Sequence, residues 1–397
     1  MTPPLPRIAI VGGGLGGFSA LLHLQRLGFP ATLYERDVSL EARQHIGGIL
    51  DMHGDSGQRA LDAAGVPWRD KVVEGADMSR IYNMAGELLY EDDASAPSDE
   101  SARPEIDRSD LRRLLHDAAL PESVKWDHAV SSIESTPTGT YTLTFANGTS
   151  TEADLVVGAD GANSRVRPLV SSAKPTYTGF NGGEVSLSPA STQLPSLRET
   201  VAKLSPGSSF MLQEGLGIFA QRQGTGRLRL YVWFASLSLA SFSLPSSDPP
   251  AARELLLSHI PSAPFWVIDL VKHCDPDAIY QRPIFSLPAD HSWPHKQGVT
   301  LLGDAAHLMP PAGDGANLAL LDGLELAETL AAARDAQGDG TTTTTWWDEA
   351  VTGFEGKMMA RANEAAVEGK EMWRMMLGPE TPGALVKFFE SMGPPPE

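Results

Sequence analysis

The first part of the chain alternates between apolar runs and a glycine-rich turn. Residues 8–11 form a continuous apolar run that is typical of a buried strand, and residues 31–34 read as a second strand. Between them, a cluster of glycines leads into a helical pattern. The pattern over residues 7–36 therefore predicts a strand–helix–strand unit that opens a doubly wound sheet.

Similar signals return further along the chain. Residues 155–158 and 299–302 are apolar runs of strand length. A helix is expected to start near residue 108, with Ser109 as its N-cap and apolar residues on one face, and another is expected over 316–334.

The middle of the chain has a different pattern. Residues 176–290 are dominated by alternating apolar and polar positions, as in 227–234, and 79–90 suit a short hairpin. The sequence therefore predicts an α/β fold in which a sheet-rich domain is inserted between strands of a discontinuous Rossmann-like domain. An amphipathic helix rich in Met and Trp is expected over 346–377, as a packing helix that bridges the two domains.

The glycine turn carries the first chemical signal. Gly12, Gly14 and Gly17 occupy the three glycine positions of G-x-G-x-x-G, and Glu35 ends the following strand. In this motif the first glycine permits a tight turn, the second lets a pyrophosphate approach the backbone, and the third allows close packing of helix on strand. An acid about 20 residues further on grips a ribose diol. These features predict a dinucleotide site.

Two more expected strands end in glycine and aspartate. Asp160 follows the first of them and Asp304 the second. Both side chains would lie at the edge of the sheet that carries the glycine turn, where they can contact ribose, ribityl or phosphate groups. After Asp304, a loop containing Pro311, Gly313 and Gly315 enters a helix whose positive N-terminus suits a ring that gains negative charge on reduction.

Composition narrows the possible partners. The 397 residues include 31 basic and 50 acidic side chains, a net charge of −19, which argues against nucleic acid or an anionic membrane as a partner. No apolar run is long enough for a membrane span, and the amino terminus lacks a signal-peptide pattern. A single cysteine, Cys274, excludes an internal disulfide, fits a reducing, cytoplasmic location, and has no metal-ligand cluster near it.

The three motifs in this order resemble the group A flavoprotein monooxygenases of the aromatic-hydroxylase type. Within that group the chain is most similar to the tetracycline-inactivating monooxygenases. The resemblance covers residues 7–175 and 297–333, in stretches at 34–37, 41–43, 47–53, 56–58 and 104–112.

The resemblance implies FAD as cofactor and NADPH as electron donor. Glu35 and Arg36 would hold the adenosine end, Arg112 and Asp304 the ribityl chain and phosphate, and Asp51 the region near the ring. Arg43 matches the family's contact to NADPH. The presence of one Rossmann fingerprint fits a family that uses NADPH transiently and has no separate nicotinamide domain.

The implied reaction is oxygen transfer. NADPH reduces FAD, reduced FAD and O₂ form a C4a-hydroperoxide, and its distal oxygen passes to an electron-rich substrate carbon. The substrate would be a small aromatic, polyketide-like or alkaloid-like molecule, hydroxylated or epoxidised by a protein expected to be a monomer. The sequence reveals no fixed acid–base or nucleophile set, so no catalytic side chain and no metal ligand is assigned.

The implied domain bounds follow from these assignments. Residues 1–78, 101–175 and 293–340 would form the FAD-binding domain, residues 79–100 and 176–292 the substrate-binding domain, and 346–377 the C-terminal helix.

Substrate contacts are less well defined by the sequence. Candidates are Met211, Phe219, Arg229 and Trp233, although strand periodicity does not reveal which face meets a pocket. We expect His307 to be a structural residue, because it follows the Gly–Asp strand end. His53 lies in a motif near the flavin ring. The loop at 310–315 is one residue shorter than in relatives, and Gly183, Ser209 and Arg229 replace the antibiotic-contacting Gln, Arg and His. Tetracycline inactivation, a flavin reductase or oxidase, and a non-catalytic flavin sensor are the alternatives.

Overall fold

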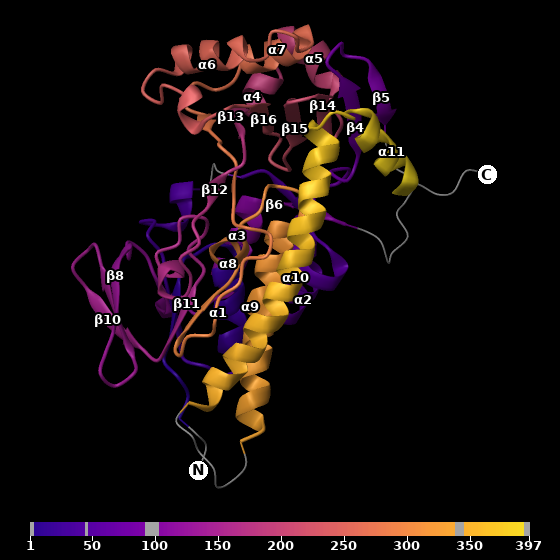
Figure 1. Cartoon of the computed structure of the whole chain (residues 1–397). Coiled ribbons are helices and arrows are strands. Elements are labelled where there is room, and N and C mark those ends of the chain that lie inside the picture. The colour runs from indigo at the N-terminus through magenta and orange to yellow at the C-terminus, as the bar shows by residue number, and fades with distance from the viewer. Residues whose placement is uncertain (1–3, 44–46, 92–102, 338–344, 393–397) are drawn as a thin grey trace.

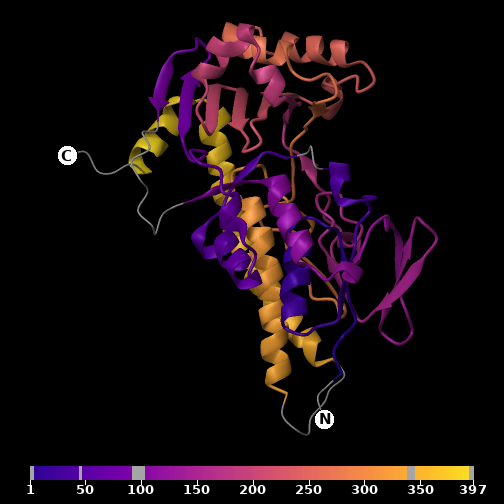
Figure 2. The same ribbon diagram turned by 180° about the vertical axis from the view of Figure 1, so that it is seen from behind.

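The computed structural model describes residues 4–43, 47–91, 103–337 and 345–392. It confirms the predicted α/β fold: a domain built on a parallel sheet lies below a second, sheet-rich domain, and a long C-terminal helix runs along both (Figure 1). The view from behind shows the same stacking of the two domains (Figure 2).

The lower domain is centred on a five-stranded parallel sheet with the order β19-β11-β1-β2-β7. Its strands come from distant parts of the chain: β1 (Ile8–Val11), β2 (Ala31–Tyr34), β7 (Val124–Lys125), β11 (Leu155–Gly158) and β19 (Val299–Leu301). Because the strands are parallel, their carboxyl ends meet at one edge of the sheet, and the three predicted motifs lie there together.

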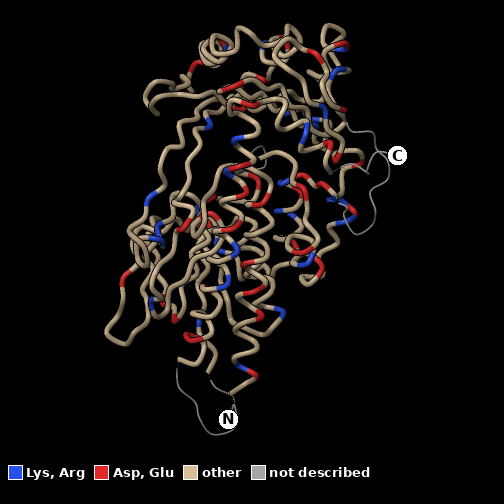
Figure 3. Tube along the Cα trace, turned by 45° about the vertical axis from the view of Figure 1, so that its right-hand side comes forward, with Lys and Arg blue, Asp and Glu red and all other residues tan. Residues whose placement is uncertain are grey.

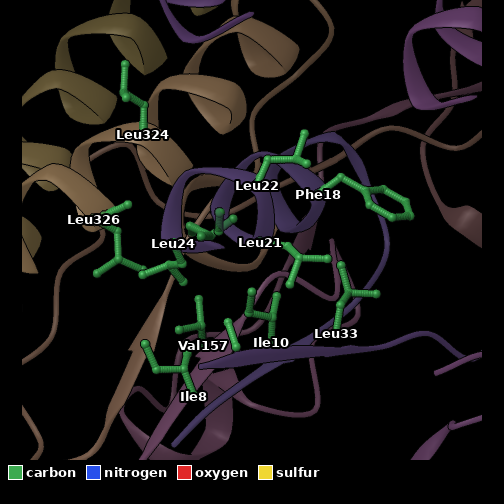
Figure 4. Packing of buried hydrophobic residues seen from close by; sticks show 14 of the residues in the cluster. Ile8, Ile10, Phe18, Leu21, Leu22, Leu24, Leu33, Val157, Leu324 and Leu326 are labelled. Carbon is green, nitrogen blue, oxygen red and sulfur yellow. The ribbon is translucent and has the colours of Figure 1, made fainter. Parts of the chain in front are cut away.

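Helix α1 (Leu15–Arg26) follows the glycine turn and packs between the sheet and helix α9 (Asp314–Asp335). Figure 4 shows how Leu21 and Leu24 of α1 meet Ile10 and Val157 of the sheet, with Leu326 of α9 beside them. Removing these side chains from water is the main stabilisation of the domain.

Smaller elements complete the lower domain. They are α2 (Arg59–Ala64), α3 (Arg108–Ala118), α8 (Asp304–His307), the ribbon β3–β6 (Ile49–Asp51 and Glu105–Asp107) and the meander β8–β10 (Val130–Ser135, Tyr141–Phe145 and Ser150–Ala153). The prediction of Ser109 as N-cap was wrong. Strand β6 runs directly into α3, so Asp107 occupies the N-cap position and Ser109 lies inside the helix.

The upper domain contains a seven-stranded sheet with the order β17-β13-β16-β15-β14-β4-β5. The strands are β4 (Ser79–Asn83), β5 (Leu88–Glu91), β13 (Phe180–Leu187), β14 (Ser208–Gln213), β15 (Leu216–Arg222), β16 (Leu228–Ala235) and β17 (Ile279–Gln281). Helices cover one face of this sheet: α4 (Pro189–Thr192), α5 (Arg198–Lys203), α6 (Pro249–Ser258) and α7 (Phe265–Lys272). A short ribbon, β12–β18 (Thr176–Tyr177 and Phe285–Ser286), lies where the chain passes between the domains.

Helix α10 (Trp346–Leu377) bridges the two domains, as predicted. Its first half packs along α9, and its last turns contact β14 and β15 of the upper sheet. Helix α11 (Gly383–Met392) turns back from its end, and Phe389 of α11 contacts Tyr90 of β5. The C-terminal segment therefore connects α9 of the lower domain to the face of the upper sheet that α4–α7 do not cover.

Charged positions are spread over both domains. Figure 3 shows Lys and Arg positions interspersed with Asp and Glu positions along the described trace. Within the described residues, no helix has the length and apolar character needed to cross a membrane.

Candidate functional site

The glycine turn has the geometry its motif requires. Gly12 has a φ of +109°, and a Cβ there would collide with the carbonyl oxygen of Ala159. A Cβ on Gly17 would collide with the carbonyl oxygen of Gly12, so α1 can approach β1 only without a side chain at that position. Gly14 differs, because a Cβ there would have no atom within 4 Å. Open space therefore lies beside the backbone at the N-terminus of α1, where a phosphate would bind.

Two charged residues hold this turn. The Glu35 carboxylate is buried and accepts hydrogen bonds from the backbone N–H groups of Gly13, at 2.5 Å, and Asp37, at 2.9 Å. Arg112 of α3 donates from Nε to the Gly13 carbonyl oxygen at 2.8 Å. Arg36, the next residue after Glu35, is exposed. Glu35 and Arg112 therefore meet at the turn, although they are far apart in sequence.

The two aspartate motifs lie at adjacent strand ends, after β11 and β19. Asp160 accepts the Arg165 N–H at 2.6 Å through one oxygen, while its other oxygen is buried without a partner. Burial raises the pKa of Asp160. Asp304 begins α8 with an exposed side chain. The buried Arg167 joins the two loops, because it donates to the carbonyl oxygens of Ala305 at 2.7 Å and of Ala162 at 2.9 Å.

A further cluster lies where α9 begins. Asp51, at the end of β3, is 2.8 Å from His53 Nε2, and Asp314 is 3.6 Å from His53 Nδ1. Asn317 is buried and holds the two segments together: it donates to the Asp51 carbonyl oxygen at 2.9 Å and accepts the His53 N–H at 3.0 Å. Across the ribbon from Asp51, burial and the nearby carboxylates of Asp51 and Asp77 raise the pKa of Glu105 to about 9.

The proline–glycine loop leads directly into this cluster. Pro311 is exposed, and Gly313, with a φ of +107°, places α9 so that its first residue faces His53. A Cβ on Gly315 would meet no atom within 4 Å, so the backbone at the start of α9 is open to a ligand. The side chain of Arg43 lies outside the described residues.

The upper sheet directs one face toward this region. Tyr231 of β16 and Gln221 of β15 lie against Gly48, where a Cβ would come 3.0 Å from the Tyr231 hydroxyl oxygen. On the same face, Trp233 stacks on Tyr231 at 5.1 Å between ring centroids and contacts Phe219 at 5.2 Å. Phe219 and Trp233, two of the four predicted substrate contacts, therefore present aromatic rings on the face that meets the lower domain.

Met211 and Arg229 do not fit the sequence interpretation. Met211 is fully buried in the core between the sheet and its covering helices, because β14 turns that position to the opposite face. Arg229 lies on the inward face, but it is only 2% exposed and forms an ion pair with Glu184, which also pairs with Arg282 at 2.7 Å. Arg229 is therefore a buried structural charge, since its guanidinium is already paired inside the sheet.

His307 is also buried and structural, in agreement with the interpretation favoured from the sequence. Its Nε2 lies 2.7 Å from Asp322 of α9. His53, by contrast, is one of the residues that join the end of β3 to the start of α9.

A comparison with known proteins decides the family. The model of the FAD binding domain family matches residues 6–352, which includes both domains and the start of α10. The chain belongs to this family. The family match and the chain's relatives together show that the protein is an FAD-dependent monooxygenase of the aromatic-hydroxylase type.

The relatives of this monooxygenase include both fungal and bacterial enzymes. Monooxygenase asqM of Emericella nidulans is 29% identical over 383 residues, which cover 82% of this chain and 83% of that protein. The 3-amino-4-hydroxybenzoate 2-monooxygenase PtmB3 of Streptomyces platensis is 30% identical over 348 residues, covering 83% and 80%. The solved structure of tetracycline destructase Tet(51) has a TM-score of 0.69 at 20% identity and covers 100% of this chain and 99% of that chain, which shows a shared fold.

Sequence reasoning missed the residues that hold the monooxygenase's loops in place. Arg167, Asn317 and Asp322 are buried and polar, and each makes hydrogen bonds to the backbone of a motif loop. The one available signal was a polar residue in an otherwise apolar helix face, as at Asn317 and Asp322 of α9. Buried polar side chains need partners, so such positions indicate a tertiary contact without identifying it.

Proposed function

We propose that this monooxygenase oxidises NADPH and transfers one oxygen atom of O₂ to a small, electron-rich aromatic, polyketide-like or alkaloid-like substrate. The observation that carries the proposal is that the loops after β1, β11 and β19 lie together at one edge of the parallel sheet. An aromatic face of the upper sheet lies opposite them. Bound FAD supplies the hydride acceptor and the activation of O₂.

Different residues of the chain would bind different parts of the cofactor. The open backbone at Gly14 fits the pyrophosphate, since N–H groups at the N-terminus of α1 favour negative charge. Glu35 and Arg36 would hold the adenosine end, and Asp304 with Arg112 would hold the ribityl and phosphate groups. Asp160 borders the same region, at the end of β11.

The ring would lie between the start of α9 and the upper sheet. Gly315 leaves the backbone open there, and Gly313, with its positive φ, lies next to the Asp51 carboxylate. The positive end of a 22-residue helix favours negative charge on a reduced ring. Arg43 remains the proposed contact for NADPH.

Substrate would bind on the aromatic face. Phe219 and Trp233 form an apolar wall of two tilted rings, and Trp373 of α10 packs against Trp233 at 5.5 Å between ring centroids. Aromatic side chains suit a flat, conjugated substrate and exclude the water that would divert activated oxygen.

The decisive experiment is stopped-flow reduction of the bound flavin by NADPH in the presence of phenols, quinones and tetracyclines. We expect a substrate of the right class to accelerate reduction and to acquire one atom of ¹⁸O from ¹⁸O₂. Hydride transfer without oxygen uptake would instead indicate a reductase. Bound FAD that no candidate molecule and no NADPH or NADH can turn over would indicate a sensor protein.

A further inference from the structure

A buried carboxylate links three helices behind the Gly303–Asp304 loop. Asp322 of α9 is fully buried, and its Oδ2 accepts the Gly303 N–H at 3.0 Å and lies 2.7 Å from His307 Nε2. Its Oδ1 accepts a hydrogen bond from the guanidinium of Arg361, on α10, at 2.8 Å. One side chain therefore contacts the loop, α8 and the C-terminal helix.

The contact to Gly303 acts where the loop is most constrained. Gly303 has a φ of +56°, in the left-handed region, and directly precedes Asp304. Its N–H is directed inward to Asp322, so that Asp304 begins α8 with its carboxylate toward the outside. A change in the position of Asp322 would therefore shift Asp304.

Asp322 is held as an anion. Burial alone would raise the pKa of Asp322, but His307, Arg361 and the Gly303 N–H together lower it. A buried anion requires its partners, because an unpaired charge in the interior is strongly unfavourable. Arg361 is the partner that comes from outside the α8–α9 region.

We propose that Arg361 is a positioning residue for the cofactor: through Asp322 it links the docking of α10 to the binding of FAD at the Gly303–Asp304 loop. This inference rests on the proposed role of Asp304. Linkage is reciprocal, so bound FAD would also hold α10 in place. The same helix carries Trp373 to the substrate face, 12 residues or about 18 Å further on. Cofactor binding would thus help to order one wall of the substrate site.

The test compares Arg361→Gln with Glu325→Gln in the purified holoenzyme. Glu325 is the matched control, because it pairs with the same guanidinium at 2.6 Å but is not among the groups bonded to Gly303. FAD release on dilution is followed by flavin fluorescence, and amide hydrogen exchange of α10 is measured with and without excess FAD.

We expect Arg361→Gln to raise the Kd for FAD about tenfold or more, as for loss of a charge-assisted hydrogen bond. It should also abolish the protection that FAD gives to α10. Glu325→Gln should change the Kd less than about twofold, within the usual range of partly exposed ion pairs. The melting temperature of the FAD-free protein separates a loss of linkage from general destabilisation.

Two further variants keep the result interpretable. In a double-mutant cycle, Arg361→Gln and Asp322→Asn should be non-additive in FAD affinity, whereas additive effects would overturn the linkage. Asp304→Ala tests the underlying proposal separately. If Asp304→Ala weakens FAD binding and Arg361→Gln does not, the linkage is wrong. If Asp304→Ala has no effect, the placement of the cofactor at this loop is wrong.

Discussion

At the scale of single residues, identical residue types have different roles at neighbouring positions. Gly12 and Gly17 are required by the fold, since a Cβ on either would collide with backbone. Gly14 has an extended backbone with φ −80° and free space around it, so the fold itself tolerates a side chain there. A requirement for glycine at position 14 would therefore come from a ligand.

This difference predicts opposite outcomes for two substitutions. Gly14→Val should yield folded protein without yellow colour, because the side chain fills the space proposed for pyrophosphate. Gly17→Val should yield little folded protein, because its side chain meets the Gly12 carbonyl oxygen. Circular dichroism and the flavin absorbance of the purified proteins distinguish them, and a yellow Gly14→Val protein with the parent's FAD affinity would refute the proposed phosphate position.

The buried ion pair of Arg229 allows a second prediction at this scale. Arg229→Met should lower the free energy of unfolding by about 3 kcal/mol, because it leaves Glu184 with Arg282 as its remaining partner. Arg227→Met, two residues away, removes a partly exposed pair with Asp275 and should cost about 1 kcal/mol or less. Urea unfolding measures both. Equal, small effects combined with a raised KM would show that Arg229 binds substrate after all.

At the scale of elements, α10 is the longest helix among the described residues, with 32 residues. Its first half is held to α9 by the bond from Arg361 to Asp322, and its last turns by Trp373 and Met376 in the aromatic cluster of the upper sheet. The helix is therefore attached to the lower domain by an ion pair and to the upper domain by apolar packing.

The upper anchor of α10 can be tested by truncating Trp373. Trp373 is 7% exposed and contacts Trp233 and Phe180, each at 5.5 Å. Trp373→Ala should lower the free energy of unfolding by about 3–5 kcal/mol, as for other buried aromatic truncations. It should also speed amide exchange in the last turns of α10. Val367→Ala, at a 58% exposed position of the same helix, is the control and should change stability by about 0.5 kcal/mol or less.

At the scale of the whole molecule, the first half of α10 is also bound to the lower domain by ion pairs. His295, which precedes β19, has Nδ1 2.8 Å from Glu355 and Nε2 3.2 Å from Asp348, both on α10. The second contact is an ion pair rather than an aligned hydrogen bond. Burial alone would lower the pKa of His295, but the two carboxylates together raise it.

This raised pKa makes the stability of the whole protein depend on pH. A group that binds its proton more tightly in the folded protein stabilises it fully below its unfolded pKa, about 6.5 for histidine. That stabilisation is lost as the pH rises through the higher folded pKa. We therefore expect the melting temperature to fall more steeply above about pH 6.5 in the parent than in His295→Gln. Parallel pH profiles for the two proteins would contradict this assignment.

The sequence by itself determined the parts that depend on short segments. Apolar runs, glycine positions and turn residues are set by local backbone conformation, so they correctly located β1, α1, β2, β11 and β19 and the loops that follow them. Because parallel strands place their carboxyl ends at one edge, the same segments also predicted that Gly14, Asp160 and Asp304 would come together.

Only the tertiary structure decided which face each upper strand presents and how buried charges are paired. Alternation made Met211 and Phe219 equivalent candidates, and the packing of α4–α7 on one face placed Met211 in the core. The pairs Arg229–Glu184 and Arg361–Asp322 join residues 45 and 39 positions apart. Their energies arise from burial and from distances set by the assembled elements, which no local pattern contains.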